Sequence, residues 1–228
     1  MTAEIPSNLI GSMIVASLMF AMAVWLLFHI FGNNRRISSS VGLGLIAWYA
    51  GVFFLGRHGF FGFTVATIPF IAFGFVASFI LGQWLYRHQS LKQAFATIPI
   101  PWAIGVQIFR LMGYGFLTFY SLGLIPGEFA LPTGWGDVFI GLTAIPVALI
   151  YAKWQTKSLA VIWNYLGIAD LALALTLGLS TYPRPIQVIP STPDNTLIAL
   201  FPLVMVPLLA VPVSIVLHLL TLRKIRDG

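Results

Sequence analysis

Long segments without any charged residue are the feature that most constrains how this sequence can fold. Between Glu4 and Arg35, for example, no Asp, Glu, Lys or Arg occurs. Only 8% of the 228 residues are charged and 59% are hydrophobic, and the mean hydropathy is +0.94. Because a helix of about 20 apolar residues crosses the hydrocarbon core of a bilayer, the sequence predicts an all-α, polytopic membrane protein. We expect one transmembrane domain over residues 1–228, with no soluble domain beside it.

Seven apolar segments are long enough to be transmembrane helices. They cover residues 8–31, 40–56, 63–86, 98–122, 134–152, 158–180 and 195–222, with boundaries accurate only to a few residues. The N-terminal segment lacks the basic region of a secretory signal, so we interpret it as a retained span. The chain contains no cysteine, which excludes disulfides and thiolate metal sites.

Lysine and arginine are distributed unevenly between the predicted loops. Nine of them fall on one side of a seven-helix bundle: Arg35, Arg36, Arg87, Lys92, Lys153, Lys157, Arg223, Lys224 and Arg226. Only Arg57 and Arg184 fall on the other side. Because basic residues in short loops tend to stay in the cytoplasm, we predict an outside N-terminus and a cytoplasmic C-terminus in a plasma or bacterial inner membrane. The same residues explain the net charge of +6 as anchors facing the lipid bilayer, and nucleic acid is not an expected partner.

Three charged residues remain inside the predicted spans, namely Arg110, Asp137 and Asp170. A charge at the bilayer centre costs about 2.5–3.5 kcal/mol, so such residues usually face protein or water and have a partner. Arg110 and Asp170 each follow the predicted inner end of their span by 12 residues, which places both roughly 18 Å above the cytoplasmic boundary. Asp137 lies roughly 22 Å above the same boundary, by the same rise per residue. We therefore expect Arg110 to pair with Asp137 or Asp170, and the sequence does not decide between them.

Uncharged polar residues are expected to border the same site. Gln107, Arg110 and Tyr114 are spaced by three and four residues, which places them on one face of an α-helix. Asn164 and Asp170 lie about 120° apart around the helix predicted over residues 158–180, so both can border one cavity. We therefore group Gln107, Tyr114 and Asn164 with the charged residues as candidate substrate- or proton-binding residues.

Asp137 also has a simpler explanation. The predicted span 134–152 places it in the first helical turn, where the helix dipole and free amide N–H groups stabilise an anion. The neighbouring Gly134 and Gly136 suit a tight entry into that helix. A capping role and a functional role for Asp137 therefore both remain open.

The charge balance of these residues suggests a function. Two carboxylates around one guanidinium leave a surplus negative charge, which a proton or a bound cation can neutralise. A carboxyl group that exchanges a proton within the membrane is a common basis for coupled transport. The leading hypothesis is therefore a transporter of a small-molecule or ion ligand, with proton coupling. The alternative is a non-catalytic accessory or assembly subunit, in a homo-oligomer or larger membrane complex, whose buried charges only hold helices together.

A haem-binding redox protein is the third hypothesis. His29 and His218 lie near the cytoplasmic ends of the first and last predicted spans, where two imidazoles can ligate haem iron. No metal-ligand cluster, phosphate-binding glycine loop or nucleophile elbow occurs in the sequence, so no metal site and no enzymatic activity are expected. Aspartyl chemistry by Asp137 and Asp170 is the one catalytic arrangement that the residues leave open.

Prolines interrupt the last predicted span. Pro202, Pro207 and Pro212 follow one another at intervals of five residues. Each removes one backbone hydrogen bond and kinks a helix, and a carbonyl freed inside a membrane must find a partner in protein or water. The sequence therefore predicts a broken helix here, beside the polar site.

Overall fold

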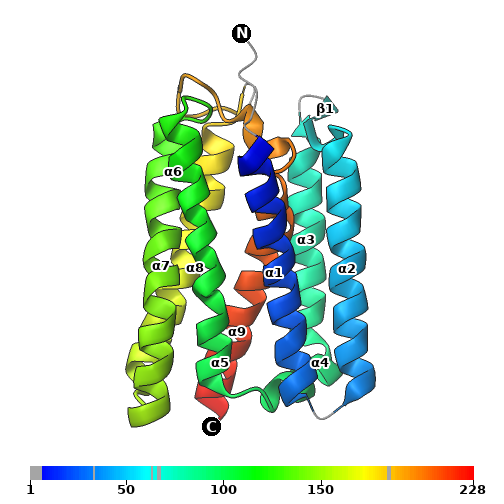
Figure 1. Ribbon diagram of the computed structural model, residues 1–228, viewed down its shortest axis with the longest axis vertical. Coiled ribbons are helices and arrows are strands. Elements are labelled where there is room, and N and C mark those ends of the chain that lie inside the picture. The colour runs from blue at the N-terminus through cyan, green and yellow to red at the C-terminus, as the bar shows by residue number, and fades with distance from the viewer. Residues whose placement is uncertain (1–6, 33, 63, 66–67, 184–185) are drawn as a thin grey trace.

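The computed structural model describes residues 7–32, 34–62, 64–65, 68–183 and 186–228. They form a bundle of long helices along one axis, with the connections at its two ends (Figure 1). The α-helices are α1 (Ser7–Phe31), α2 (Arg35–Arg57), α3 (Phe70–Arg87), α4 (Gln89–Ala96), α5 (Ile100–Gly105), α6 (Tyr114–Ser121), α7 (Gly127–Trp154), α8 (Lys157–Ser180) and α9 (Val211–Asp227). The shorter elements are the 3-10 helices η1 (Phe60–Gly62), η2 (Val106–Gly113) and η3 (Thr196–Ala199), the π-helix η4 (Val206–Ala210), and the strands β1 (Thr64–Val65) and β2 (Ile68–Pro69).

Six helical segments of the described chain are long and apolar enough to cross a membrane. They are Ile10–Phe31, Arg35–Arg57, Ile100–Ser121, Gly127–Trp154, Lys157–Ser180 and Val206–Asp227. Helices α3 and α4 are bent by 70° where they meet, and they provide a seventh span if they are counted as one. The polytopic helical class predicted from the sequence is confirmed at this level.

Helices α2 and α3 begin at other residues than predicted. Helix α2 begins at Arg35 rather than at residue 40, because the Asn34 side chain accepts hydrogen bonds from the backbone N–H groups of Arg36 and Ile37 and caps the helix. Helix α3 begins at Phe70 rather than at residue 63, because β1 and β2 pair antiparallel immediately before it. Arg35 and Arg36 therefore lie in a first helical turn and not in a loop.

The last predicted span is a broken helix, as its prolines indicate. Residues 201–204 form turns, and π-helix η4 joins them to α9. Pro212 cannot donate the hydrogen bond that the Leu208 carbonyl would accept in a regular α-helix. The indole Nε1–H of Trp48 in α2 donates to that carbonyl instead, at 2.7 Å. The hydroxyl of Ser78 in α3 is shared between the Gly74 carbonyl at 2.8 Å and the Leu208 carbonyl at 3.1 Å. Neighbouring spans thus satisfy the backbone that proline leaves open.

The hydrophobic core surrounds this irregular segment. Leu203, Leu208 and Leu209 are at most 1% exposed and belong to the larger of two buried clusters. In the segment Val206–Asp227, 72% of the most apolar 18 residues are buried, whereas in the other candidate spans this share is at most 39%. Helix α9 is therefore an interior element of the bundle, and the other described spans keep larger exposed apolar surfaces.

Removing both donors to the Leu208 carbonyl is expected to destabilise the bundle by more than the sum of the single losses. Trp48→Phe or Ser78→Ala leaves one donor in place, so each alone should cost about 1 kcal/mol. The double variant leaves a buried acceptor unpaired, which adds about 1–3 kcal/mol. Unfolding in mixed micelles, followed by circular dichroism, measures the three free energies. Strictly additive losses would show that the two donors do not share this carbonyl.

Basic residues gather at one end of the bundle. This is the end at which α1, α7 and α9 finish and α2 and α8 begin (Figure 1). Nine lie there, in the first turn or the last two turns of helices or in α4: Arg35, Arg36, Arg87, Lys92, Lys153, Lys157, Arg223, Lys224 and Arg226. Arg57 lies at the opposite end, where α2 finishes, and Arg184 lies outside the described residues. We call the end that holds these nine residues the basic end of the bundle.

Candidate functional site

Arg110 lies on a 3-10 helical segment in the middle of the span formed by α5, η2 and α6. In a 3-10 helix three residues make one turn, so residues i and i+3 lie above one another. Gln107, Arg110 and Gly113 therefore share one face of η2, and all three are buried. Tyr114 is rotated off this face and is 65% exposed. The predicted stripe through Tyr114 does not form, because it assumed the period of a regular α-helix.

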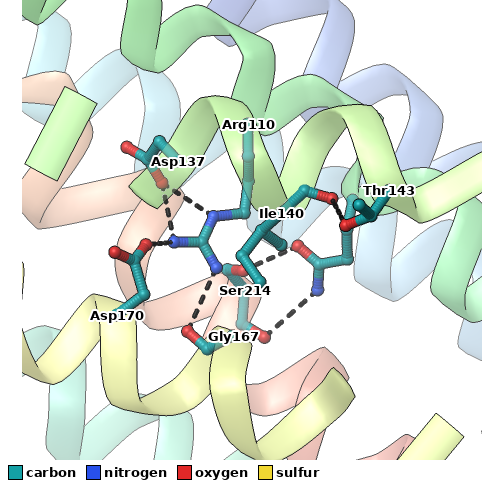
Figure 2. Close-up of polar contacts among 8 residues, drawn as sticks. Arg110, Asp137, Ile140, Thr143, Gly167, Asp170 and Ser214 are labelled. Carbon is teal, nitrogen blue, oxygen red and sulfur yellow. Dashed lines mark hydrogen bonds and ion pairs between the residues drawn. The ribbon is translucent and has the colours of Figure 1, made fainter. Parts of the chain in front are cut away.

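Arg110 pairs with both aspartates at once. Its Nε and Nη2 atoms each lie 2.7 Å from Asp137 Oδ1, and Nη2 also contacts Asp170 Oδ2 (Figure 2). The remaining Nη1 donates to the backbone carbonyl of Gly167 at 3.1 Å. Arg110 is only 1% exposed. We call Arg110, Asp137 and Asp170 the charge triad, and it joins three elements, η2, α7 and α8, at one level of the bundle.

Asp137 lies in the interior of α7 and not in its first turn. Helix α7 begins at Gly127 rather than at residue 134, and the stabilising effect of a helix dipole falls off within the first turn. The residues expected to form a loop are helical because Phe129 and Ala130, 2% and 0% exposed, pack into the core. The capping explanation of Asp137 is therefore wrong, and its carboxylate depends on Arg110.

Glycines make the close approach of the three elements possible. A Cβ atom on Gly113 would lie 2.2 Å from Asp137 Cβ, and one on Gly136 would lie 1.8 Å from Asp170 Oδ1. Neither residue was identified as part of the site from the sequence, where Gly136 was interpreted only as part of a helix entry. The available signal was weak: Gly113 is three residues from Arg110, and Gly136 is next to Asp137.

A second polar layer connects α9 to two of these elements, η2 and α8. The Ser214 hydroxyl donates to Gln107 Oε1 at 2.7 Å, and His218 Nδ1 lies 2.8 Å from Asn164 Oδ1. Because the Asn164 amide nitrogen donates to the Ala160 carbonyl, its oxygen is the acceptor and we assign the histidine proton to Nδ1. Gln107 and Asn164, both candidate site residues, thus contact α9 rather than the triad carboxylates.

The two histidines considered as haem ligands lie in different surroundings. His218 is 0% exposed, and its Nε2 has no hydrogen-bond partner in the described part of the chain. His29 is half-buried, and its ring lies 4.9 Å from the Trp25 ring. Nothing in this arrangement tests haem binding, which stays a prediction. Among the described residues, no group of three or more His, Cys, Asp or Glu side chains could hold a metal ion.

An apolar cavity of about 160 Å³ adjoins the charge triad between α3 and α8. It lies toward the end opposite the basic end, because it extends from Ile71 in the first turn of α3 to Leu179 in the last turn of α8. Helices α6 and α7 and the segment 198–211 complete its walls. Thr133, Asp137 and Tyr182 are the polar residues among those that line it.

The polar groups of this cavity have unused hydrogen-bonding capacity. Asp137 Oδ1 accepts both contacts from Arg110, and its Oδ2 has no hydrogen bond from any residue that the structure describes. Thr133 is 1% exposed, and its hydroxyl has no partner in the same described ranges. At the far end of the cavity, burial and the nearby Asp194 carboxylate raise the pKa of the Tyr182 phenol, so this group stays protonated and neutral.

Comparison with known proteins identifies the family of the chain. Residues 62–226, more than half of the sequence, match the family described as Domain of unknown function (DUF8737). The chain belongs to this family. The matched region includes the whole charge triad, the second polar layer and every residue that lines the cavity. No curated protein and no solved structure shows significant similarity to the chain.

Proposed function

We propose that the chain is a membrane transport protein that moves a small positively charged molecule or ion, coupled to protons. One observation carries this proposal: the charge triad has one cation for two carboxylates, and Asp137 lies at the wall of a cavity. Electrostatic energies are large in a low-dielectric interior, so the surplus negative charge favours a proton or a bound cation. Exchange of a bound proton for a bound cation at these carboxylates is the elementary step of proton-coupled transport.

The direction of the chain in the membrane follows from its basic end. Nine basic residues lie there, and Arg57 is the one found at the other end of the described chain. The cytoplasmic leaflet carries anionic lipids that attract such residues, and short basic loops tend to stay in the cytoplasm. We therefore place the basic end in the cytoplasm, the cavity in the outer half of a plasma or bacterial inner membrane, and the first helix with its N-terminal end outside.

A second candidate function is an accessory or assembly subunit. The observation in its favour is that all three nitrogens of the Arg110 guanidinium are engaged, and that the surrounding contacts tie four elements together. A guanidinium whose nitrogens all have hydrogen-bond partners in the protein needs no ligand. In that case the charges only hold the bundle together, and neither aspartate would exchange a proton.

Proton movement through the reconstituted protein separates the two functions. Proteoliposomes that enclose a pH-sensitive dye are given a rise in external sodium, benzylamine, glucose or benzoate, and the proton current is the initial rate at which their internal pH changes, relative to protein-free liposomes. We expect a proton current with at least one of the two cationic probes, and none with glucose or benzoate. Asp170→Asn should abolish the current, because a neutral amide cannot exchange a proton. The variant should still fold, since Arg110 and Asp137 then form a balanced pair.

Asp227→Asn is the matched control, because Asp227 is an exposed carboxylate at the basic end, outside the triad and the cavity wall. Its current should equal that of the unmodified protein. Size-exclusion chromatography and circular dichroism establish that each variant is folded. If Asp170→Asn is folded and no probe gives a current that depends on Asp170, the transport proposal fails and the accessory function replaces it.

A further inference from the structure

We propose that the cavity between α3 and α8 binds a small apolar primary amine, whose ammonium group donates to Asp137 Oδ2 and to the Thr133 hydroxyl. As the identity of a transported substrate, this inference rests on the proposed function. As a binding site, it rests on the cavity alone. Four features of the cavity support the inference: its size, the negative charge beside it, its unpaired acceptors and its opening toward the lipid.

The size and lining of the cavity determine the apolar part of the ligand. Its volume of about 160 Å³ is close to that of engineered cavities of about 150 Å³ that hold a single benzene ring. Phe75, Phe116 and Phe129 line it together with aliphatic side chains. Aromatic rings pack favourably against one another in offset or edge-to-face arrangements. The body of the ligand is therefore one ring or a short branched chain.

The charge of the triad determines the polar part. An ammonium group neutralises the surplus negative charge beside the cavity, whereas a carboxylate or phosphate would add to it. A bare metal ion of the calcium or magnesium type prefers six or more oxygen ligands. The described cavity wall supplies side-chain oxygens from only Thr133, Asp137 and Tyr182. A charged amine, which needs two or three acceptors, fits this set better.

The unpaired hydroxyl of Thr133 is the second sign of a ligand. A buried polar group without a hydrogen bond costs about 1–3 kcal/mol, and Thr133 is 1% exposed with no partner for Oγ1 among the described residues. It lines the same cavity as Asp137, one helical turn away on α7. Residues i and i+4 lie on one face of a helix. A single donor group in the cavity can therefore bond both side chains.

The cavity opens toward the bilayer. Val76 in α3 and Leu179 in α8 both line it, yet they are 54% and 43% exposed on the lipid-facing surface of the bundle. An apolar amine partitions into membranes, so it can reach the cavity sideways between α3 and α8. A strongly hydrated ion has no comparable route through this apolar wall. The opening thus favours the same ligand class as the charge and the size.

Binding of benzylamine to the full chain in lipid nanodiscs tests the inference by isothermal titration calorimetry. Benzylamine carries one ring and an amine that is protonated at neutral pH, and benzyl alcohol is its uncharged counterpart. We expect benzylamine to bind at least about tenfold more tightly than benzyl alcohol, as a charge-assisted hydrogen bond implies. Benzoate should not bind.

Two variants and one control locate the site. Thr133→Val removes only the hydroxyl, leaves the fold intact because that hydroxyl has no partner, and should weaken benzylamine binding about tenfold. Thr176→Val, at an exposed position of α8, should leave the affinity unchanged. Asp137→Asn should abolish binding. Because this second variant alters the triad, Thr133→Val remains the decisive one if Asp137→Asn does not fold.

Failure of this inference is distinct from failure of the transport proposal. Equal binding of benzylamine and benzyl alcohol, or unchanged affinity in Thr133→Val, overturns the amine site. A sodium-driven proton current that depends on Asp170, without benzylamine binding, leaves transport intact and removes the amine. Benzylamine binding that responds to Thr133→Val, without any current, supports the site and overturns transport.

Discussion

Arg110→Met is expected to prevent the folded protein from accumulating in the membrane. Arg110 is 1% exposed and is the cation that contacts both Asp137 and Asp170. Its loss leaves two carboxylates close together without a counter-ion, and breaking a buried ion pair in this way costs about 3–5 kcal/mol. Quantitative immunoblotting of membranes and size-exclusion chromatography measure the loss.

Two further variants show whether charge is the cause. Arg57→Met makes the same substitution at an exposed position at the end of α2, and it should accumulate normally. The triple variant Arg110→Met, Asp137→Asn, Asp170→Asn removes all the charges of the triad and should recover much of the folded protein, since no uncompensated charge remains. If the triple variant is as unstable as Arg110→Met, the hydrogen-bond geometry of the guanidinium matters more than its charge.

Gly113→Ala is expected to separate η2 from α7 and to weaken the triad without changing any charge. The added methyl group would lie 2.2 Å from Asp137 Cβ, an atom that cannot move without the helix. Overpacking of this kind typically costs about 1–3 kcal/mol, and the Arg110–Asp137 contact would lengthen as well. The free energy of unfolding in mixed micelles should therefore fall, and proton-dependent currents should fall with it.

Gly115→Ala, two residues further along the chain, is the matched control. A Cβ atom on Gly115 meets nothing within 4 Å. Alanine in a helix is favoured over glycine by about 0.5–1 kcal/mol, so this variant should be as stable as the parent chain or slightly more stable. Equal destabilisation by both substitutions would mean that the close approach of η2 and α7 is not what holds the triad together.

The membrane class and the members of the charge triad could be predicted from the sequence. Hydropathy is a local property, so Arg110, Asp137 and Asp170 were recognisable as charges inside apolar segments before any helix was placed. The estimate of depth was also sufficient to bring Arg110 and Asp170 to one level, because the short 3-10 segment η2 changes the length of its span only slightly. Partner choice was not predictable, and the structure joins Arg110 to both acids.

Two details of the site were predicted incorrectly for the same reason. Tyr114 was assigned to the buried stripe on the assumption of a regular α-helix, whereas the local 3-10 geometry of η2 aligns Gly113 with Arg110 instead. Asp137 was assigned to a first turn, whereas α7 extends back to Gly127. In both cases packing against other elements set the local backbone geometry, and a pattern of residue types does not contain that information.

The sequence by itself determined which segments are apolar enough to cross a bilayer, which end of the bundle is basic, and how many charges must find partners inside. Only the tertiary structure decided how those charges are shared, which glycines let the helices approach, and that an apolar cavity with unpaired acceptors lies beside Asp137. The physical reason is that the free-energy cost of removing a charged group from water follows from the type of residue. The ion pairs and hydrogen bonds that offset this cost depend on residues that are distant in the sequence and close only in the folded chain.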